Sequence, residues 1–190
     1  MWYGGSNNFS GEISREIGNR LVNVTSVLLS GNQLTGFVPF STCSRGPGLD
    51  SNTQYIDLSS NKLSGSIPTT IRYCTSLEYL NLGYNNLAGN VPKELVQAKL
   101  LQILQLNDNN LNGTVLDFIS ALYKLQVLYL GNNNFGGSIS NMFGSSLNSL
   151  KILCLRSNNF SGSIPEEIAY FAELQILDLS GNILSGLIPN

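Results

Sequence analysis

The sequence predicts a solenoid, an array of stacked units in which each unit packs only on its neighbours. The first sign is an asparagine that recurs at steps of 25, 29, 24, 24, 24, 25 and 24 residues, because a fixed period in the twenties is typical of such arrays. The second is a pair of leucine-like residues before most of these asparagines, and the third is a Gly-x-Ile-Pro-like segment after them. At 190 residues the chain is then one continuous array. The asparagines are Asn7, Asn32, Asn61, Asn85, Asn109, Asn133, Asn158 and Asn182.

Each unit begins with a predicted strand. In the seventh unit, Leu153 and Leu155 alternate with Cys154 and Arg156, which is the period of a strand with one buried face. The other units repeat this alternation, although in the first unit Gly4 stands where the second leucine is expected. The strands should therefore stack leucine over leucine and leave the intervening residues on the opposite face.

The asparagine after each strand falls where the chain turns inward. A buried asparagine can hydrogen-bond loop backbone groups that no sheet partner reaches, so the stacked asparagines are expected to form a column of amide hydrogen bonds. Loss of one amide would leave buried backbone groups unpaired, at a cost of about 1–3 kcal/mol. The predicted ladder consists of Asn32, Asn61, Asn85, Asn109, Asn133, Asn158 and Asn182.

The second half of each unit carries the chain back along the outer side. Gly162 suits a turn with positive φ. The pair Ile164 and Pro165 starts the return path, where the missing N–H of proline does little harm. Acidic residues after Pro92 and Pro165 predict the opening of a short helical turn.

The combined pattern, LxxLxLxxNxLxGxIPxxI, resembles the plant-specific class of leucine-rich repeat and covers essentially all of residues 1–190. Its Gly-x-Ile-Pro half separates this class from other leucine-rich repeats. The resemblance implies an α/β solenoid of about eight repeats, mostly strand and coil. It also implies a right-handed superhelix with an inner parallel β-sheet, one strand per repeat, and a second short strand after the asparagine turn.

The segment from Leu155 to Pro165 is most similar to late repeats in the ectodomains of plant receptor-like proteins and receptor-like kinases. This implies a recognition module on the extracellular side of the cell membrane, which binds a peptide, hormone or microbial product and signals with a co-receptor kinase. The array is uncapped, because the paired-cysteine caps of such receptors are missing from the sequence, as are their membrane span and kinase. We therefore expect a segment of a longer ectodomain. Two alternatives stay open: a secreted inhibitor of a cell-wall polygalacturonase, and a fragment without a ligand.

The candidate binding surface is the face of the inner sheet that the buried leucines do not use. On the fourth to seventh rungs it departs from the generic residues of the family and combines tyrosines, amides and one cation. Tyrosine offers a large contact area at low cost in conformational entropy, so this patch suits an extended peptide or a glycan. Alternatively, solvent-facing strand positions accept such residues without any ligand. The candidates are Tyr79, Asn81, Tyr84, Gln105, Asn107, Asp108, Tyr129 and Arg156.

The three cysteines, Cys43, Cys74 and Cys154, are too few and too scattered for a disulfide framework or a zinc site. Cys74 lies just before a buried leucine position, so a buried free thiol is expected there in preference to a bridge. The sequence does not set the distance from Cys74 to Cys43. Cys154 is expected to face outward on the inner sheet.

Four Asn-x-Ser/Thr sequons, at Asn8, Asn23, Asn112 and Asn159, are candidate glycosylation sites. In a chain this rich in asparagine and serine, about four sequons arise by chance, so their number does not itself argue for secretion. Asn112 and Asn159 are expected in exposed turns.

Composition argues against several function classes. A net charge of −2 and a pI near 5.0 do not suit nucleic acid, and no apolar run approaches the roughly 20 residues that span a bilayer. The sequence has no histidine, which nucleophilic triads usually need as a base. It also has no phosphate-loop or metal-binding motif and no acid pair in a predicted cleft. We therefore expect a non-catalytic protein without a cofactor or a metal.

Overall fold

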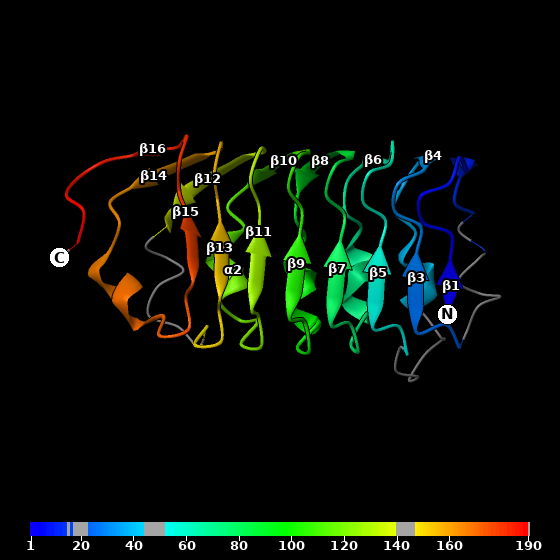
Figure 1. Cartoon of the computed structure of the whole chain (residues 1–190), viewed down its shortest axis with the longest axis horizontal. Coiled ribbons are helices and arrows are strands. Elements are labelled where there is room, and N and C mark those ends of the chain that lie inside the picture. The colour runs from blue at the N-terminus through cyan, green and yellow to red at the C-terminus, as the bar shows by residue number, and fades with distance from the viewer. Residues whose placement is uncertain (15, 17–22, 44–51, 140–146, 190) are drawn as a thin grey trace.

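The computed structural model describes residues 1–14, 16, 23–43, 52–139 and 147–189. Its largest element is an eight-stranded parallel sheet whose strands lie side by side in chain order (Figure 1). We call this the inner sheet. Its strands are β1 (Trp2–Tyr3), β3 (Ser26–Leu28), β5 (Tyr55–Asp57), β7 (Tyr79–Asn81), β9 (Ile103–Gln105), β11 (Val127–Tyr129), β13 (Ile152–Cys154) and β15 (Ile176–Asp178).

The register of the inner sheet places equivalent residues of successive coils side by side. Leu80 pairs with Leu104, and Leu104 pairs with Leu128. All three side chains are fully buried, which is the stacking that the alternating pattern predicts. Even the first unit joins the sheet, since Tyr3 of β1 pairs with Leu28 of β3.

A second set of strands, after the asparagine turns, forms another layer along one edge of the solenoid, seen at the top of Figure 1. Six of them form one sheet: β6 (Ser64–Gly65), β8 (Asn86–Asn90), β10 (Asn110–Gly113), β12 (Asn134–Ser138), β14 (Asn159–Gly162) and β16 (Ile183–Leu184). Two others, β2 (Ser10–Glu12) and β4 (Gln33–Thr35), pair with each other.

Short helical turns carry the chain along the side opposite the inner sheet. Pro92 and Pro165 stand directly before η3 and η5 as N-cap residues, at the places where the sequence predicts helical turns. None of the helices in the described ranges is long and apolar enough to cross a membrane. The helical elements are η1 (Phe40–Cys43), η2 (Thr69–Tyr73), η3 (Lys93–Gln97), α2 (Leu116–Ile119) and η5 (Glu166–Tyr170).

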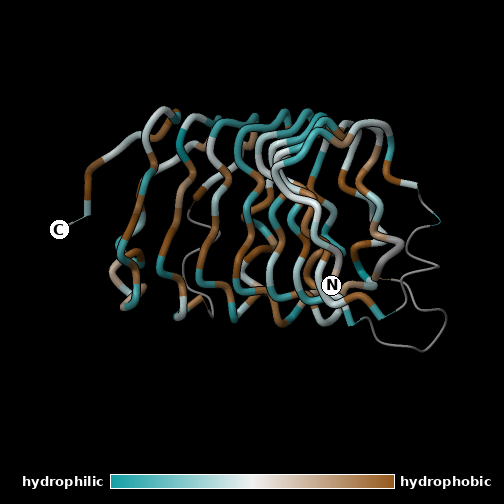
Figure 2. Tube along the Cα trace, turned by 45° about the vertical axis from the view of Figure 1, so that its right-hand side comes forward, coloured by the Kyte–Doolittle hydropathy of each residue, from teal (hydrophilic) through white to brown (hydrophobic). Residues whose placement is uncertain are grey.

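The core is one continuous cluster of buried apolar side chains between the inner sheet and the helical turns. Figure 2 shows hydrophobic segments recurring from coil to coil, with hydrophilic residues gathered at the turns along the upper edge. Larger side chains fill the same positions in some coils, as Phe135 and Phe160 do with stacked rings whose centroids are 6.4 Å apart. Because this core buries one side of each inner strand, it determines which residues of the strand face outward.

A ladder of asparagine side chains seals the turns. The amide nitrogen of Asn133 donates to the carbonyl oxygens of Leu106, Leu130 and Gly131, and its side-chain oxygen accepts from the N–H of Leu111. Equivalent bonds recur at Asn32, Asn61, Asn85, Asn109, Asn158 and Asn182.

Asn7 departs from this ladder. Its side chain is exposed, and its amide donates at 2.8 Å to the carbonyl of Gly5 within the same turn. The ladder of inter-coil bonds that the structure describes therefore starts at Asn32, whose amide reaches back to the carbonyl of Gly4.

The expectation of a free thiol at Cys74 is wrong. Cys43 and Cys74 form a disulfide rather than leaving a free thiol at Cys74. The reason is that η1 and η2 stack as neighbouring turns, which brings the two Cα atoms to 4.8 Å. Cys154 lies on the outward face of the inner sheet, as expected, but neighbouring side chains bury it there, and its sulfur lies 3.9 Å from Oδ2 of Asp178 on the next strand.

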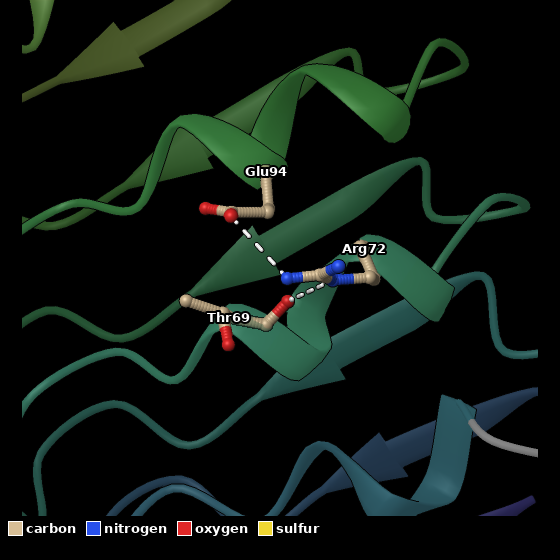
Figure 3. Close-up of polar contacts among 3 residues, drawn as sticks. All are labelled: Thr69, Arg72 and Glu94. Carbon is tan, nitrogen blue, oxygen red and sulfur yellow. Dashed lines mark hydrogen bonds and ion pairs between the residues drawn. The ribbon is translucent and has the colours of Figure 1, made fainter.

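An ion pair connects two helical turns on the outer side (Figure 3). Nη2 of Arg72 lies 3.3 Å from Oε1 of Glu94, and Nε of Arg72 donates to the carbonyl oxygen of Thr69. Because both side chains are partly exposed to solvent, the pair contributes at most about 1 kcal/mol. It belongs to the stacking of η2 on η3 and lies away from the face considered next.

Candidate ligand-binding face of the inner sheet

The outward side chains of the inner sheet form two rows along the solenoid, because equivalent positions pair in register. The first row, contributed by the first residue of each strand from β5 to β15 of this sheet, consists of Tyr55, Tyr79, Ile103, Val127, Ile152 and Ile176. The second row, contributed by the last residue, consists of Asp57, Asn81, Gln105, Tyr129, Cys154 and Asp178. The first row is apolar or aromatic throughout, and the second is mostly polar.

The sequence-predicted residues divide between these rows and the turns that follow them. Tyr79 lies in the first row, and Asn81, Gln105 and Tyr129 lie in the second. The other four, Tyr84, Asn107, Asp108 and Arg156, follow the strands in the turns before the ladder asparagines.

Tyr84 has an unusual backbone conformation for its residue type. Its φ is +55°, in the left-handed region that a bulky residue rarely adopts. The equivalent position is occupied by Asn132 with φ +55° and by Ser157 with φ +52°, which are small polar residues. Tyr84 as a whole is 56% exposed, so the turn presents a large aromatic side chain at a position that these other coils fill with small polar residues.

A cavity of about 280 Å³ runs diagonally across the C-terminal half of the face. It starts at the turn after β7 and ends at β15, so it crosses from the turns to the first row. Four of the predicted residues line it, and four further residues come from the sixth to eighth coils. The lining residues are Tyr84, Asn107, Tyr129, Gly131, Cys154, Arg156, Ile176 and Asp178.

The remaining predicted residues form hydrogen bonds within the same coil or with the next coil. Tyr79 donates its hydroxyl to Oε1 of Gln105 at 3.5 Å and accepts from the amide of Asn81 at 3.3 Å. The oxygens of Asp108 accept from the amides of Asn107 and Asn132, each at 2.8 Å. Asp108 thus orders two neighbouring turns and does not line the cavity opposite Arg156.

Two glycines leave room for Arg156 and Asn107 to lie against the backbone of the preceding coil. A Cβ added to Gly131 would lie 2.9 Å from Cγ of Arg156, and one added to Gly83 would lie 3.0 Å from Oδ1 of Asn107. The guanidinium stem therefore lies directly over the backbone of the preceding coil. Sequence reasoning missed both glycines, because the repeat pattern leaves these positions variable.

Asp178 is the carboxylate of the cavity. Hydrogen bonds from the hydroxyl and N–H of Ser180, at 2.6 and 3.1 Å, lower the pKa of Asp178 below its usual value, and the charge of Arg156 lowers it further. Burial raises the pKa of the Cys154 thiol, so the thiol stays protonated and is a poor nucleophile. The cavity offers hydrogen-bond donors, aromatic faces and one cation partly compensated by Asp178.

In the part of the chain that the structure describes, no group of three or more histidine, cysteine, aspartate or glutamate side chains could hold a metal ion. What the face supplies is contact area and hydrogen bonding. Such a surface suits binding of a ligand.

The four sequons are all exposed. Asn112 lies in β10 and Asn159 in β14, on the second layer of strands, and Asn8 lies just before β2. Asn23 lies before β3 in an exposed turn. Asn112 and Asn159 are thus exposed as expected, but they lie in strands of the second layer and not in turns.

Family models described as leucine rich repeat match residues 124–184, 52–74 and 76–97. A search of curated protein sequences finds no significant match. Among solved structures, the chain is similar to the Arabidopsis receptor kinase HAESA, crystallised in complex with the peptide hormone IDA and the co-receptor SERK1, with 34% identity and a TM-score of 0.86. That match covers 96% of this chain and 30% of the HAESA chain.

Two further Arabidopsis ectodomains show the same likeness. The receptor kinase GASSHO1/SCHENGEN3, solved in complex with CASPARIAN STRIP INTEGRITY FACTOR 2, is 30% identical over 96% of this chain and 24% of its own, with a TM-score of 0.78. The leucine-rich repeat ectodomain of the receptor kinase SOBIR1 is 34% identical over 66% of this chain and 68% of its own, with a TM-score of 0.62. The chain thus spans about a quarter to a third of the two longer ectodomains.

Proposed function

Because this chain belongs to the leucine-rich repeat family of plant receptor ectodomains, we propose that it is a non-catalytic recognition module. It binds an extracellular peptide or a microbial ligand on the inner sheet. The parent receptor acts on the extracellular side of the cell membrane and signals with a co-receptor kinase. The observation that carries this proposal is the diagonal cavity, where Tyr84, Asn107, Tyr129 and Arg156 converge from four successive coils.

The chemistry of this cavity suits a peptide. Asn107 can pair with a peptide backbone amide, and Arg156 can donate to a carbonyl or carboxylate oxygen. Tyr84 and Tyr129 supply aromatic contact area with a polar end, as is common in protein interfaces. HAESA, which shares the fold at 34% identity, was crystallised with a peptide hormone.

The disulfide between Cys43 and Cys74 supports an extracellular setting. Disulfides persist in oxidising compartments and are rare in the cytosol. The sequons at Asn8, Asn23, Asn112 and Asn159 would carry N-glycans in the same pathway. Glycans on Asn112 and Asn159 would project from β10 and β14 and leave the inner sheet accessible.

A displayed library of random dodecapeptides tests the proposal. Peptides enriched on the wild-type chain are measured for affinity by biolayer interferometry. The variant Tyr84→Ala/Tyr129→Ala/Arg156→Ala is expected to lose at least tenfold in affinity, because it removes both aromatic walls and the cation. The far-UV circular dichroism should not change, since all three side chains lie outside the core.

The matched control removes two tyrosines and one cation from the outer side. Tyr73, Tyr123 and Lys124 are exposed there, so Tyr73→Ala/Tyr123→Ala/Lys124→Ala should bind the selected peptides as the wild type does. Equal affinity of the two triple variants would refute the inner sheet as the binding surface.

A single glycine gives a finer test of the same cavity. Gly131→Ala places a methyl group 2.9 Å from Cγ of Arg156 and should displace the guanidinium, weakening peptide binding severalfold. Gly136→Ala is the control, because its added Cβ would meet its nearest neighbour at an ordinary 3.5 Å. Unaltered binding by Gly131→Ala would show that the position of Arg156 is unimportant for the ligand.

A further inference from the structure

A second cavity, of about 430 Å³, lies at the N-terminal end of the same face. It spans β1, β3, β5 and β7, whereas the diagonal cavity begins after β7 and ends at β15. Sequence reasoning treated this end as generic and named only Tyr79 from it. The residues that line it are Met1, Tyr3, Ser26, Leu28, Tyr55, Asp57 and Tyr79.

The shape of this cavity follows from side-chain size along three neighbouring strands. Ser26 and Leu28 on β3 are short and form a floor. Tyr3 on β1 and Tyr55 on β5 rise on either side, with 64% and 40% of their surfaces exposed. Since β1 and β5 are two strand spacings apart, their backbones are separated by about 10 Å. The register places Tyr3 level with Leu28, and Tyr55 level with Ser26, so the two tyrosines lie diagonally across this floor. A planar group bound over the floor can therefore contact both side chains.

A third tyrosine closes the cavity toward the middle of the face. The rings of Tyr55 and Tyr79 have centroids 6.5 Å apart and are tilted by 37°. The Tyr79 ring is thus close to Tyr55 but not parallel to it. Three aromatic side chains surround one space.

Two carboxylates give this end of the face a negative charge. Oδ1 of Asp57 accepts from the N–H and the hydroxyl of Ser59, at 3.0 and 2.6 Å, which fixes the carboxylate beside the rings. Oε2 of Glu78 lies 3.5 Å from the hydroxyl of Tyr55 and 3.4 Å from Nε2 of Gln102. Among the described residues that line the cavity there is no lysine or arginine.

The charge of Asp57 acts on Tyr79, one of the tyrosines that line the cavity. Burial raises the pKa of Tyr79, a hydrogen bond from Asn81 opposes this, and the charge of Asp57 raises it further. Tyrosine faces with adjacent carboxylates attract a cation by both ring quadrupole and charge. A guanidinium adds planarity, which allows it to stack between rings.

We propose that this tyrosine–carboxylate cavity, lined by Tyr3, Tyr55, Tyr79 and Asp57 with Glu78 beside the Tyr55 hydroxyl, binds the guanidinium of an arginine side chain. The arginine belongs to the peptide that occupies the inner sheet, so this identity of the ligand rests on the proposed function. The binding of a guanidinium group to the cavity does not depend on it.

The first row extends the description of the ligand beyond the arginine. After Tyr79 the row continues as Ile103, Val127, Ile152 and Ile176, which are half-buried or exposed. From β5 to β15 it spans five strand spacings, or about 24 Å, which an extended peptide covers in about seven residues. The ligand that fits is thus a short extended segment with arginine at one end and aliphatic side chains along the rest.

Small probes test the cation site without knowledge of the natural ligand. The probe is Nα-acetyl-arginine amide, and its neutral counterpart of the same shape is Nα-acetyl-citrulline amide. Binding is followed by NMR on protein labelled with ¹³C at the tyrosine rings, with Met1 acetylated so that its α-ammonium cannot compete. The arginine probe should shift the Tyr3, Tyr55 and Tyr79 signals at least fivefold more strongly than the citrulline probe at equal concentration.

The variant Asp57→Asn/Glu78→Gln removes both charges and keeps the side-chain shapes. It should weaken binding of the arginine probe at least fivefold. Glu166→Gln/Glu167→Gln, which removes two charges from η5 on the outer side, should have no effect. Equal shifts from the two probes, or unchanged binding by Asp57→Asn/Glu78→Gln, would overturn the proposal.

The same measurement separates this inference from the proposed function. The variant Tyr84→Ala/Tyr129→Ala/Arg156→Ala should still bind the arginine probe, because its changes lie outside the cavity. Library peptides that bind the inner sheet without an arginine preference would overturn the assignment of the ligand and leave the recognition function standing. A library that yields no binder, with the arginine probe still bound, would count against peptide recognition while supporting the cation site.

Discussion

At the residue scale, one amino-acid type serves opposite purposes at neighbouring positions of each turn. Asn133 is buried and bonds to four backbone groups, whereas Asn134 beside it is exposed at the start of β12. The difference arises from the turn, which points one side chain into the coil and the next one outward. The repeat period, rather than composition, therefore identifies which asparagines are structural.

This contrast yields a prediction. Asn133→Ala should lower the free energy of unfolding by about 1–3 kcal/mol, because it leaves the buried carbonyls of Leu106 and Leu130 and the N–H of Leu111 without their partner. Asn134→Ala should change it by no more than about 0.5 kcal/mol, as is usual for surface positions. Urea denaturation measures both, and a loss of equal size in the two variants would argue against the ladder.

Single residues also mark where sequence reasoning stops. Asp178 looks like a generic filler of the repeat, yet it lines the diagonal cavity because Cys154 and Arg156 on the preceding coil open a space beside it. Asp108 looks like a binding residue, but its two carboxylate oxygens already accept hydrogen bonds from the amides of Asn107 and Asn132. In both cases the deciding neighbours come from other coils, and a period alone does not specify how their side chains meet.

At the scale of elements, the pattern of apolar residues predicts the inner strands and the places of the helical turns well. The buried positions Leu80, Leu104 and Leu128 follow directly from alternation, and η3 and η5 begin where proline and acids predict. The bridge between η1 and η2 could not be predicted in the same way, because the 31 residues that separate Cys43 from Cys74 set no distance. The stacking of two consecutive turns supplies the distance.

The disulfide leads to a second prediction. Cys43→Ala/Cys74→Ala should lower the free energy of unfolding by about 3–4 kcal/mol, the expected effect of closing a loop of this length. Urea unfolding of the wild type should become easier after reduction, whereas the double variant should not respond to reductant.

Cys154→Ala is the control for this experiment. Its thiol is free, so the variant should keep the full response to reductant. A wild type that unfolds identically with and without reductant would show that the bridge does not contribute to stability.

At the scale of the whole molecule, the inner sheet is a single face with two chemically distinct ends. Tyrosines and carboxylates gather over β1 to β7, while Arg156, Asp178 and Tyr129 gather over the last coils. An apolar row connects them. An extended ligand would therefore bind in one direction only, because reversing it would exchange its charged ends.

The final coil leads to a third prediction, about the behaviour of the isolated 190-residue chain. Leu187 and Ile188 are 89% and 83% exposed, and Leu177 is also exposed. Exposed apolar groups of this kind favour association, so light scattering should show dimers or larger species that increase with concentration. Leu187→Ser/Ile188→Ser should shift the distribution toward monomer, whereas Tyr73→Ser/Tyr123→Ser should not. A uniform monomer at all concentrations would contradict this expectation.

The asparagine ladder has a consequence for how such molecules lengthen over evolutionary time. Asn133 and its equivalents each give one amide bond to the coil before and receive one backbone N–H from that same coil. Every coil consequently presents the same donors and acceptors upstream and downstream. A gene duplication that inserts a whole coil would bring its own complete set of partners, so the solenoid can grow by one coil without disturbing the coils already present.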